Sequence, residues 1–174
     1  MNAKKSLYKR LMSVGLLALC AACQQMPAAQ PLPAKPASVW TDPQVRALRE
    51  LGFAPMEGDE WSLNLAASVL FDFDSDQVRP LQRQQLERIG RTLDQVGVKG
   101  LRVEGHSDNV GDADYNRRLS LRRAGAVAQL LAAAGLPREH LPTQGHGSAK
   151  PIADNASEAG RAQNRRVVLI APSL

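Results

Sequence analysis

Apolar residues recur at steps of three and four in two long stretches of the chain. In residues 80–96 this spacing places Leu86, Ile89 and Leu93 on one face, with charged residues opposite. In residues 116–134 it places Leu119 and Val127 on the inner side of an alanine-rich segment. Both stretches therefore predict amphipathic helices, the second capped by Asn116.

Shorter segments with strand-like patterns flank these helices. They cover residues 69–73, 101–104, 142–146 and 165–170. In chain order the elements predict a β-α-β-α-β-β domain over residues 66–174, an α+β sandwich with a mixed sheet and the helices on one face. A right-handed crossover should join the strand at Val69 to the strand at Val103.

A short segment precedes this domain. Residues 40–52 predict a helix that Thr41 or Asp42 caps and Gly52 ends. Residues 61–65 alternate like a strand. We therefore expect residues 39–65 to form an N-terminal appendage.

The first 38 residues have the layout of a lipoprotein leader. Four basic residues precede the short apolar run 11–22, which predicts a signal peptide over residues 1–22. Two alanines before Cys23 resemble a bacterial lipobox, which implies that Cys23 is the lipidated residue and carries palmitate or a similar acyl chain. Gln24 is not the aspartate of inner-membrane retention, so we expect outer-membrane sorting. The proline-rich linker 23–38 could hold the domain about 45 Å from the membrane.

Charge argues against nucleic acid as a partner. The net charge of +5 comes from 22 basic and 17 acidic residues, but four of the basic residues lie in the first ten positions. Cleavage before Cys23 would leave 18 basic residues against 17 acidic ones, a balance of +1. The nucleic-acid interpretation of the high pI fails there.

The most informative stretch lies between the strand at Val103 and the second long helix. It reads GHSDNVG, then YN, LS and RA, and it puts Asp108 in a loop and Arg123 about two turns into the helix. An acid and a guanidinium presented to one ligand suit a zwitterion. The alternative is an intramolecular salt bridge between Asp108 and Arg123. Arg122 should point about 100° away from Arg123 and be solvated.

Together with QGHGSAKPIADN and GRAQNRRV, this pattern resembles the OmpA-like C-terminal peptidoglycan-binding domain over residues 69–170. The resemblance implies that Asp108 and Arg123 clamp the diaminopimelate of the peptidoglycan stem peptide. Asp74 or Ser75, in the segment similar to the family's FDxxS, would border the pocket. The remaining expected contacts are backbone amides of Asn109 and Gly111, wall residues Asn116 and Leu119, and one of Arg165 and Arg166.

Metal, cofactor and catalytic chemistry find little support. Asp72, Asp74 and Asp76 alternate, but Gln77 stands where an EF-hand loop needs glycine. His106 and His146 lack the other zinc ligands, so we expect structural histidines bonded to strand-end backbone. Serines, histidine and aspartate occur together, yet no GxSxG elbow exists. We expect a non-enzyme, with a peptidoglycan amidase or peptidase as the less favoured alternative.

The N-terminal appendage carries a second, weaker resemblance. Its W..P..V..L...GF…W.L pattern resembles lipoproteins of the YfiB type, which implies capture of a YfiR-like periplasmic repressor and control of a diguanylate cyclase in c-di-GMP signalling. The alternative is that Leu48, Phe53 and Trp61 only cover one edge of the core. The sequence therefore predicts an outer-membrane lipoprotein with a periplasmic peptidoglycan-binding domain. It either has this signalling role or is a purely structural, Pal-like envelope tether.

Overall fold

The computed structural model describes residues 39–173. The predicted signal peptide, the lipidation site Cys23 and the linker 23–38 lie outside the described residues, so these predictions stay predictions. Within residues 39–173, no helix is both long enough and apolar enough to cross a membrane.

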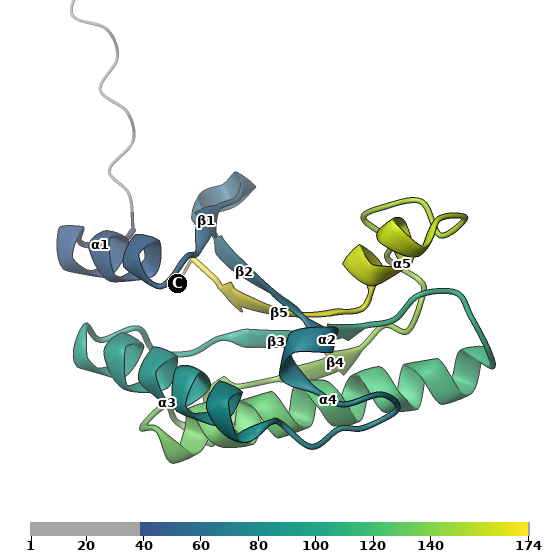
Figure 1. Ribbon diagram of the computed structural model, residues 1–174. Coiled ribbons are helices and arrows are strands. Elements are labelled where there is room, and N and C mark those ends of the chain that lie inside the picture. Colours follow the sequence, from purple (N-terminus) through teal and green to yellow (C-terminus); the bar gives the residue numbers. More distant parts are fainter. Residues whose placement is uncertain (1–38, 174) are drawn as a thin grey trace, which may run out of the picture. The chain divides into compact units, whose positions relative to one another are not determined.

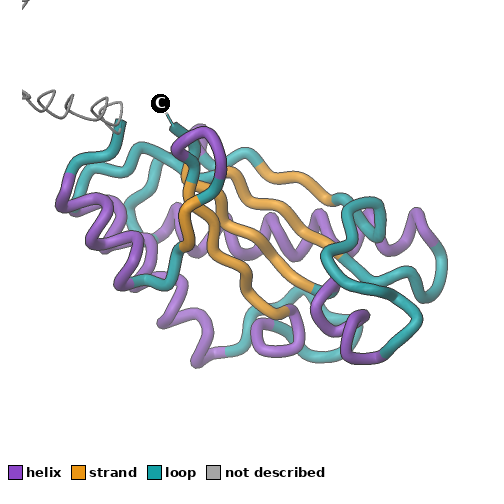
Figure 2. The backbone as a smooth tube through the Cα atoms, turned by 90° about the horizontal axis from the view of Figure 1, so that it is seen from above, coloured by secondary structure: helices purple, strands orange, loops and turns teal. Residues whose placement is uncertain are grey.

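A five-stranded mixed sheet forms one layer, and the two long helices form the other (Figure 1). Figure 2 looks onto the sheet from above, with the strands in view. The elements run in the order α1 (Asp42–Glu50), β1 (Ala54–Pro55), the 3₁₀ turn η1 (Glu57–Asp59), β2 (Trp61–Ala66), α2 (Ala67–Leu70), α3 (Pro80–Gln95), β3 (Arg102–His106), α4 (Ala113–Ala133), η2 (Arg138–His140), β4 (Thr143–Gly145), α5 (Glu158–Asn164) and β5 (Arg166–Ala171).

The strand order across the sheet is β1-β2-β5-β3-β4. Strand β5 pairs antiparallel with both β2 and β3, whereas β3 and β4 are parallel. Strands β2 and β3 therefore run in the same direction on either side of β5, and α3 lies on the connection between them. The predicted α+β fold, with a mixed sheet and helices on one face, is confirmed.

The predicted first strand is wrong. Residues 67–70 form the helical turn α2, and Phe71 makes only an isolated bridge with Val78. The first long strand is β2, which pairs with β5 over its whole length from Trp61 to Ala66. A short apolar run is compatible with a strand or a buried helical turn, and pairing with β5 decides between them. The predicted boundary between appendage and domain, after Leu65, falls inside β2.

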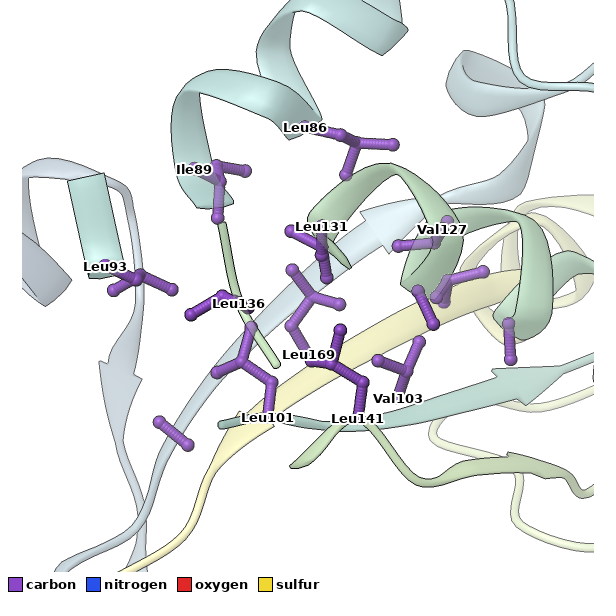
Figure 3. Close-up of a cluster of buried hydrophobic side chains, with 14 of the residues drawn as sticks. Leu86, Ile89, Leu93, Leu101, Val103, Val127, Leu131, Leu136, Leu141 and Leu169 are labelled. Atoms are coloured by element: carbon purple, nitrogen blue, oxygen red, sulfur yellow. The ribbon is translucent and has the colours of Figure 1, made fainter. Parts of the chain in front are cut away.

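The core lies between the helices and the sheet (Figure 3). Helix α3 contributes Leu86, Ile89 and Leu93, and the facing positions of α4 are Val127 and Leu131; all five are almost completely buried. Fully burying such a side chain contributes about 1.5–3 kcal/mol. This core confirms the apolar stripes that predicted the two helices.

The N-terminal residues pack into this same core. Leu48, Phe53 and Trp61 are buried and belong to the central cluster. Thr41 is the N-cap of α1, and its backbone amide donates a hydrogen bond to Gln44 Oε1 at 3.0 Å. Gly52 has φ +89° just beyond the helix, the left-handed conformation that glycine favours. The predicted start and end of α1 are thus confirmed.

Candidate ligand site

The loop after β3 holds Asp108 in a fixed position. The residue is buried, with 8% of its surface exposed. Oδ1 accepts a hydrogen bond from the Val110 amide at 3.1 Å, and Oδ2 accepts one from Arg165 Nη1 at 2.7 Å. The Ser107 hydroxyl donates to the Asp108 carbonyl at 2.8 Å. These bonds keep one negative charge at the end of the strand.

Helix α4 begins three residues before the predicted start. Asp112 is the N-cap, and its side chain accepts from the Tyr115 amide at 2.7 Å. The prediction that Asn116 caps the helix is therefore wrong. Asn116 lies in the first turns and donates from Nδ2 to the Val110 carbonyl at 2.7 Å, which ties the loop to the helix. Gly111, at φ +87°, supplies the left-handed turn between them.

Two glycines let α4 lie directly on the sheet. A Cβ atom added to Gly105 in β3 would be 1.9 Å from the Ser120 carbonyl oxygen. One added to Gly145 in β4 would be 2.6 Å from the Arg117 carbonyl oxygen. A hydrogen bond reinforces this contact, since the Gly147 amide donates to Ser120 Oγ of α4 at 3.0 Å. The Ser107 amide in turn donates to the Gly147 carbonyl at 2.9 Å. Strand, loop and helix therefore form one closely packed unit.

Arg123 presents the second charge from α4. Its side chain is also largely buried, with 8% of the residue exposed. Nε donates to the Ser75 carbonyl at 2.8 Å, and the guanidinium carbon lies 5.1 Å from the centre of the Phe71 ring. Burial lowers the pKa of Arg123, and the charges of Asp74 and Asp76 act against that effect.

The segment between α2 and α3 lies along α4 and is attached to it by side chains. Asp74 Oδ1 accepts a hydrogen bond from the Tyr115 hydroxyl, and this bond is the main cause of the raised pKa of Tyr115. Asp76 pairs with Arg122 Nε at 2.8 Å. Arg122 is exposed, as predicted, with 47% of its side chain accessible to solvent, and it also forms this ion pair. The attached segment forms the wall of the site beside Arg123.

The two predicted clamp residues, Asp108 and Arg123, bind different partners within the protein. Within residues 39–173 no salt bridge joins Asp108 to Arg123, so the intramolecular alternative is wrong. Asn109 and Gly111 are exposed, whereas Asn116 and Leu119 are buried. Of the two candidate arginines, Arg165 reaches the site. Two cavities in the described part of the chain lie elsewhere; one of them, of about 270 Å³, is lined by Leu101, His140 and Pro172 among others.

The two histidines behave differently from the prediction. Both ring nitrogens of His106 are buried without a hydrogen-bond partner, so it does not bind strand-end backbone. His146 Nε2 lies 3.2 Å from Glu104 Oε2, and its ring centre is 5.1 Å from that of His106. In the described part of the chain, no group of three or more His, Cys, Asp or Glu side chains is arranged to hold a metal ion.

Acid should destabilise the fold through His106. Burial, followed by the charges of Arg166 and His146, lowers the pKa of His106 from 6.5 to about 4, although Glu104 acts in the opposite direction. Between these two values the unfolded chain binds a proton that the folded chain does not, so stability falls as pH decreases. The loss should reach about 3 kcal/mol between pH 6.5 and pH 4. Urea unfolding across this range measures it.

A His106→Asn variant should show a flatter decline over the same range, while His140→Asn, at an exposed histidine, should follow the unmodified chain. Equal slopes for all three proteins would contradict the assignment.

Glu104 affects stability at a lower pH than His106 does. Burial opposes ionisation of its carboxyl, but the Arg102 hydrogen bond and the charge of Lys150 outweigh it and lower the pKa below 4.5. The stability that Glu104 contributes is therefore lost only as pH falls below about 4.5.

Comparison with known proteins identifies the family. The model of the OmpA family matches residues 70–165. The chain is 38% identical over 167 residues to the outer-membrane lipoprotein YfiB of Pseudomonas aeruginosa, and the matched region covers 94% of each chain. It is 40% identical over 136 residues to the lipoprotein YfiB of Escherichia coli, covering 78% of this chain and 84% of that one.

Among solved structures, the cell wall anchor of the type VI secretion system from Pseudomonas aeruginosa superposes with a TM-score of 0.62. It is 31% identical and covers 75% of this chain and 97% of that chain. Family match, identity over nearly the whole length and shared fold agree with one another. The chain therefore belongs to the OmpA family and, within it, to the lipoproteins of the YfiB type.

Proposed function

We propose that this protein is an outer-membrane lipoprotein whose periplasmic domain binds peptidoglycan non-covalently through the diaminopimelate of the stem peptide. Three relationships support the proposal. The chain belongs to the OmpA family, its Pseudomonas aeruginosa relative is named an outer-membrane lipoprotein, and a structural relative is described as a cell wall anchor.

The observation that carries the proposal is a pair of buried, opposite charges, Asp108 in the loop before α4 and Arg123 in the middle of that helix. Asp108 and Arg123 are each 8% exposed, and each is held by bonds to other parts of the protein. Asp108 is already paired with Arg165, whereas within residues 39–173 no salt bridge joins Arg123 to a carboxylate. Burying a charge is costly unless it is paired, so Arg123 favours a ligand that brings a carboxylate. Asp108 would accept the diaminopimelate ammonium, and Arg123 would bind its carboxylate.

The surrounding residues would complete the contact. The exposed loop positions Asn109 and Gly111 offer backbone amides close to the N-terminus of α4, where the helix dipole favours an anionic group. Leu119 and Asn116 form the buried side, and Asp74 lies in the segment attached to α4. These contacts to the ligand are part of the proposal.

The serines near the site argue for binding rather than catalysis. Ser107 Oγ donates to the neighbouring Asp108 carbonyl. Ser120 Oγ donates to the Arg117 carbonyl at 2.9 Å and accepts from the Gly147 amide at 3.0 Å. Neither hydroxyl is hydrogen-bonded to a histidine, so neither has the general base that a serine nucleophile requires. We therefore propose that the protein is not an enzyme, and purified muropeptides should remain uncleaved after incubation with it.

Sedimentation with purified sacculi tests the function. The full chain in detergent should sediment with sacculi that contain diaminopimelate and remain in the supernatant with sacculi that contain lysine instead. Lysine keeps the ammonium but lacks the side-chain carboxylate that Arg123 would bind. Equal sedimentation with both wall types would contradict the diaminopimelate assignment, and no sedimentation with either would contradict wall binding.

A signalling role is the second candidate, and one observation favours it. The identity to the Pseudomonas aeruginosa YfiB covers 94% of this chain and therefore includes residues in front of the family match. The apolar residues Leu48, Phe53 and Trp61 of this segment are buried, so a YfiR-like repressor would have to contact its exposed positions, such as Val39 and Met56. Gel filtration with a co-encoded small periplasmic protein decides the matter. Absence of a complex would leave the purely structural, Pal-like tether.

A further inference from the structure

Arg165 connects the candidate site to helix α5. It lies at the junction of α5 and β5, and its two terminal nitrogens contact two different carboxylates. Nη1 donates to Asp108 Oδ2 and Nη2 donates to Glu158 Oε1, both at 2.7 Å. These two hydrogen bonds raise the pKa of Arg165, the bond to Asp108 having the larger effect.

The base of this side chain is fixed by backbone on both sides. The Arg165 carbonyl accepts from the Ala67 amide at 2.9 Å, and the Arg165 amide donates to the Arg161 carbonyl at 3.0 Å. Glu158 is held in turn by Arg161, whose Nε lies 3.0 Å from Oε2. The guanidinium is thus placed by its surroundings and not by Asp108 alone.

We infer that Arg165 is a positioning and specificity-determining residue of the ligand site, an inference that rests on the proposed function. It fixes the Asp108 carboxylate and places a positive charge beside it. The Asp108–Arg165 pair has no net charge, so it attracts a bare ammonium only weakly. To bind well, a ligand must also carry a carboxylate, which Arg123 and the backbone amides at the start of α4 would bind. The residue therefore favours a zwitterionic amino acid over a simple cation.

Two matched muropeptides test this. One carries unmodified diaminopimelate, and in the other the side-chain carboxylate of diaminopimelate is amidated, which keeps the ammonium and removes the negative charge. The ratio of the two dissociation constants, measured by calorimetry on the full chain in detergent, reports the preference for the zwitterion. In Arg165→Gln the site gains one negative charge, and we expect the ratio to fall about tenfold. Arg165→Lys keeps the charge and should keep the ratio within about twofold.

Two further variants separate this effect from a general loss of charge or fold. Arg46→Gln makes the same charge change at an exposed position of α1 and should leave the ratio unchanged. Glu158→Gln removes the second partner of Arg165 and should weaken both ligands to a similar degree, because it loosens Asp108 without removing the positive charge. A merely structural role of Arg165 would lower both affinities together in Arg165→Gln and leave the ratio constant.

The outcomes distinguish this inference from the proposed function. If the unmodified chain binds the diaminopimelate muropeptide and Arg165→Gln keeps the unmodified ratio, the inference is overturned and the proposed function stands. If the unmodified chain binds neither muropeptide, both are overturned. A reduced ratio in Arg165→Gln, restored in Arg165→Lys, supports the inference.

Discussion

Replacing Arg123 with alanine should abolish sedimentation of the full chain with diaminopimelate-containing sacculi. The guanidinium is the proposed partner of the ligand carboxylate, and a hydrogen bond to a charged group contributes about 1.5–3 kcal/mol. Two such bonds are expected because the planar guanidinium matches a carboxylate. The loss in affinity should therefore be at least about 100-fold. Asp108→Asn should have a comparable effect, since the amide keeps the shape of the side chain but loses its charge.

The neighbouring Arg122 provides a matched control. It is a half-exposed arginine on the same helix, paired with Asp76. Arg122→Ala should retain binding within about threefold, as expected for removal of a surface ion pair. Circular dichroism should confirm that all three variants are folded. If Asp108→Asn and Arg123→Ala both still sediment with sacculi while folded, the two residues do not form the binding site.

Replacing Gly105 with alanine should destabilise the protein, and more so than the same change at Gly145. The new Cβ would lie 1.9 Å from the Ser120 carbonyl oxygen and 2.7 Å from the Ser120 carbonyl carbon. Both obstacles are backbone atoms, so a rotamer change cannot relieve the clash and β3 must move away from α4. Overpacking of this kind costs about 1–3 kcal/mol, and we expect the upper end or more. The urea midpoint should fall accordingly.

Gly125 in the same helix offers the opposite case. A Cβ added there meets no atom within 4 Å. Gly125→Ala should therefore be neutral or stabilise the protein by up to about 1 kcal/mol through its better helix propensity. Equal urea midpoints for Gly105→Ala and the unmodified chain would show that β3 and α4 are not packed as described.

The two long helices could be predicted from sequence because their apolar stripes are long and regular. The strand at residues 69–73 could not, because a run as short as Val69-Leu70-Phe71 fits a buried helical turn equally well. The alternation in residues 61–65 did identify a strand, but nothing local indicates that β5 is its partner. Sheet membership depends on contacts between residues about a hundred positions apart.

The candidate site shows the same division. The spacing of its motifs led to Asp108 and Arg123, and both side chains proved to be buried charges. The sequence predicts Asn116 as the helix cap, whereas the observed cap is Asp112; both residue types cap helices well, and only the backbone decides between them. The contact between Asp108 and Arg165 joins residues 57 positions apart. Strand alternation predicts that Arg165 and Arg166 differ in direction, yet it does not tell which one meets the loop.

The close packing of α4 against the sheet affects how long the protein would stay bound to the cell wall. Loop, helix and strand are already in place before a ligand arrives, so association loses little free energy to ordering the protein. A site of this kind needs no rearrangement to bind again after it releases a stem peptide. On a polymer that repeats the same ligand many times, rapid recapture would keep the protein attached even if each single contact were brief.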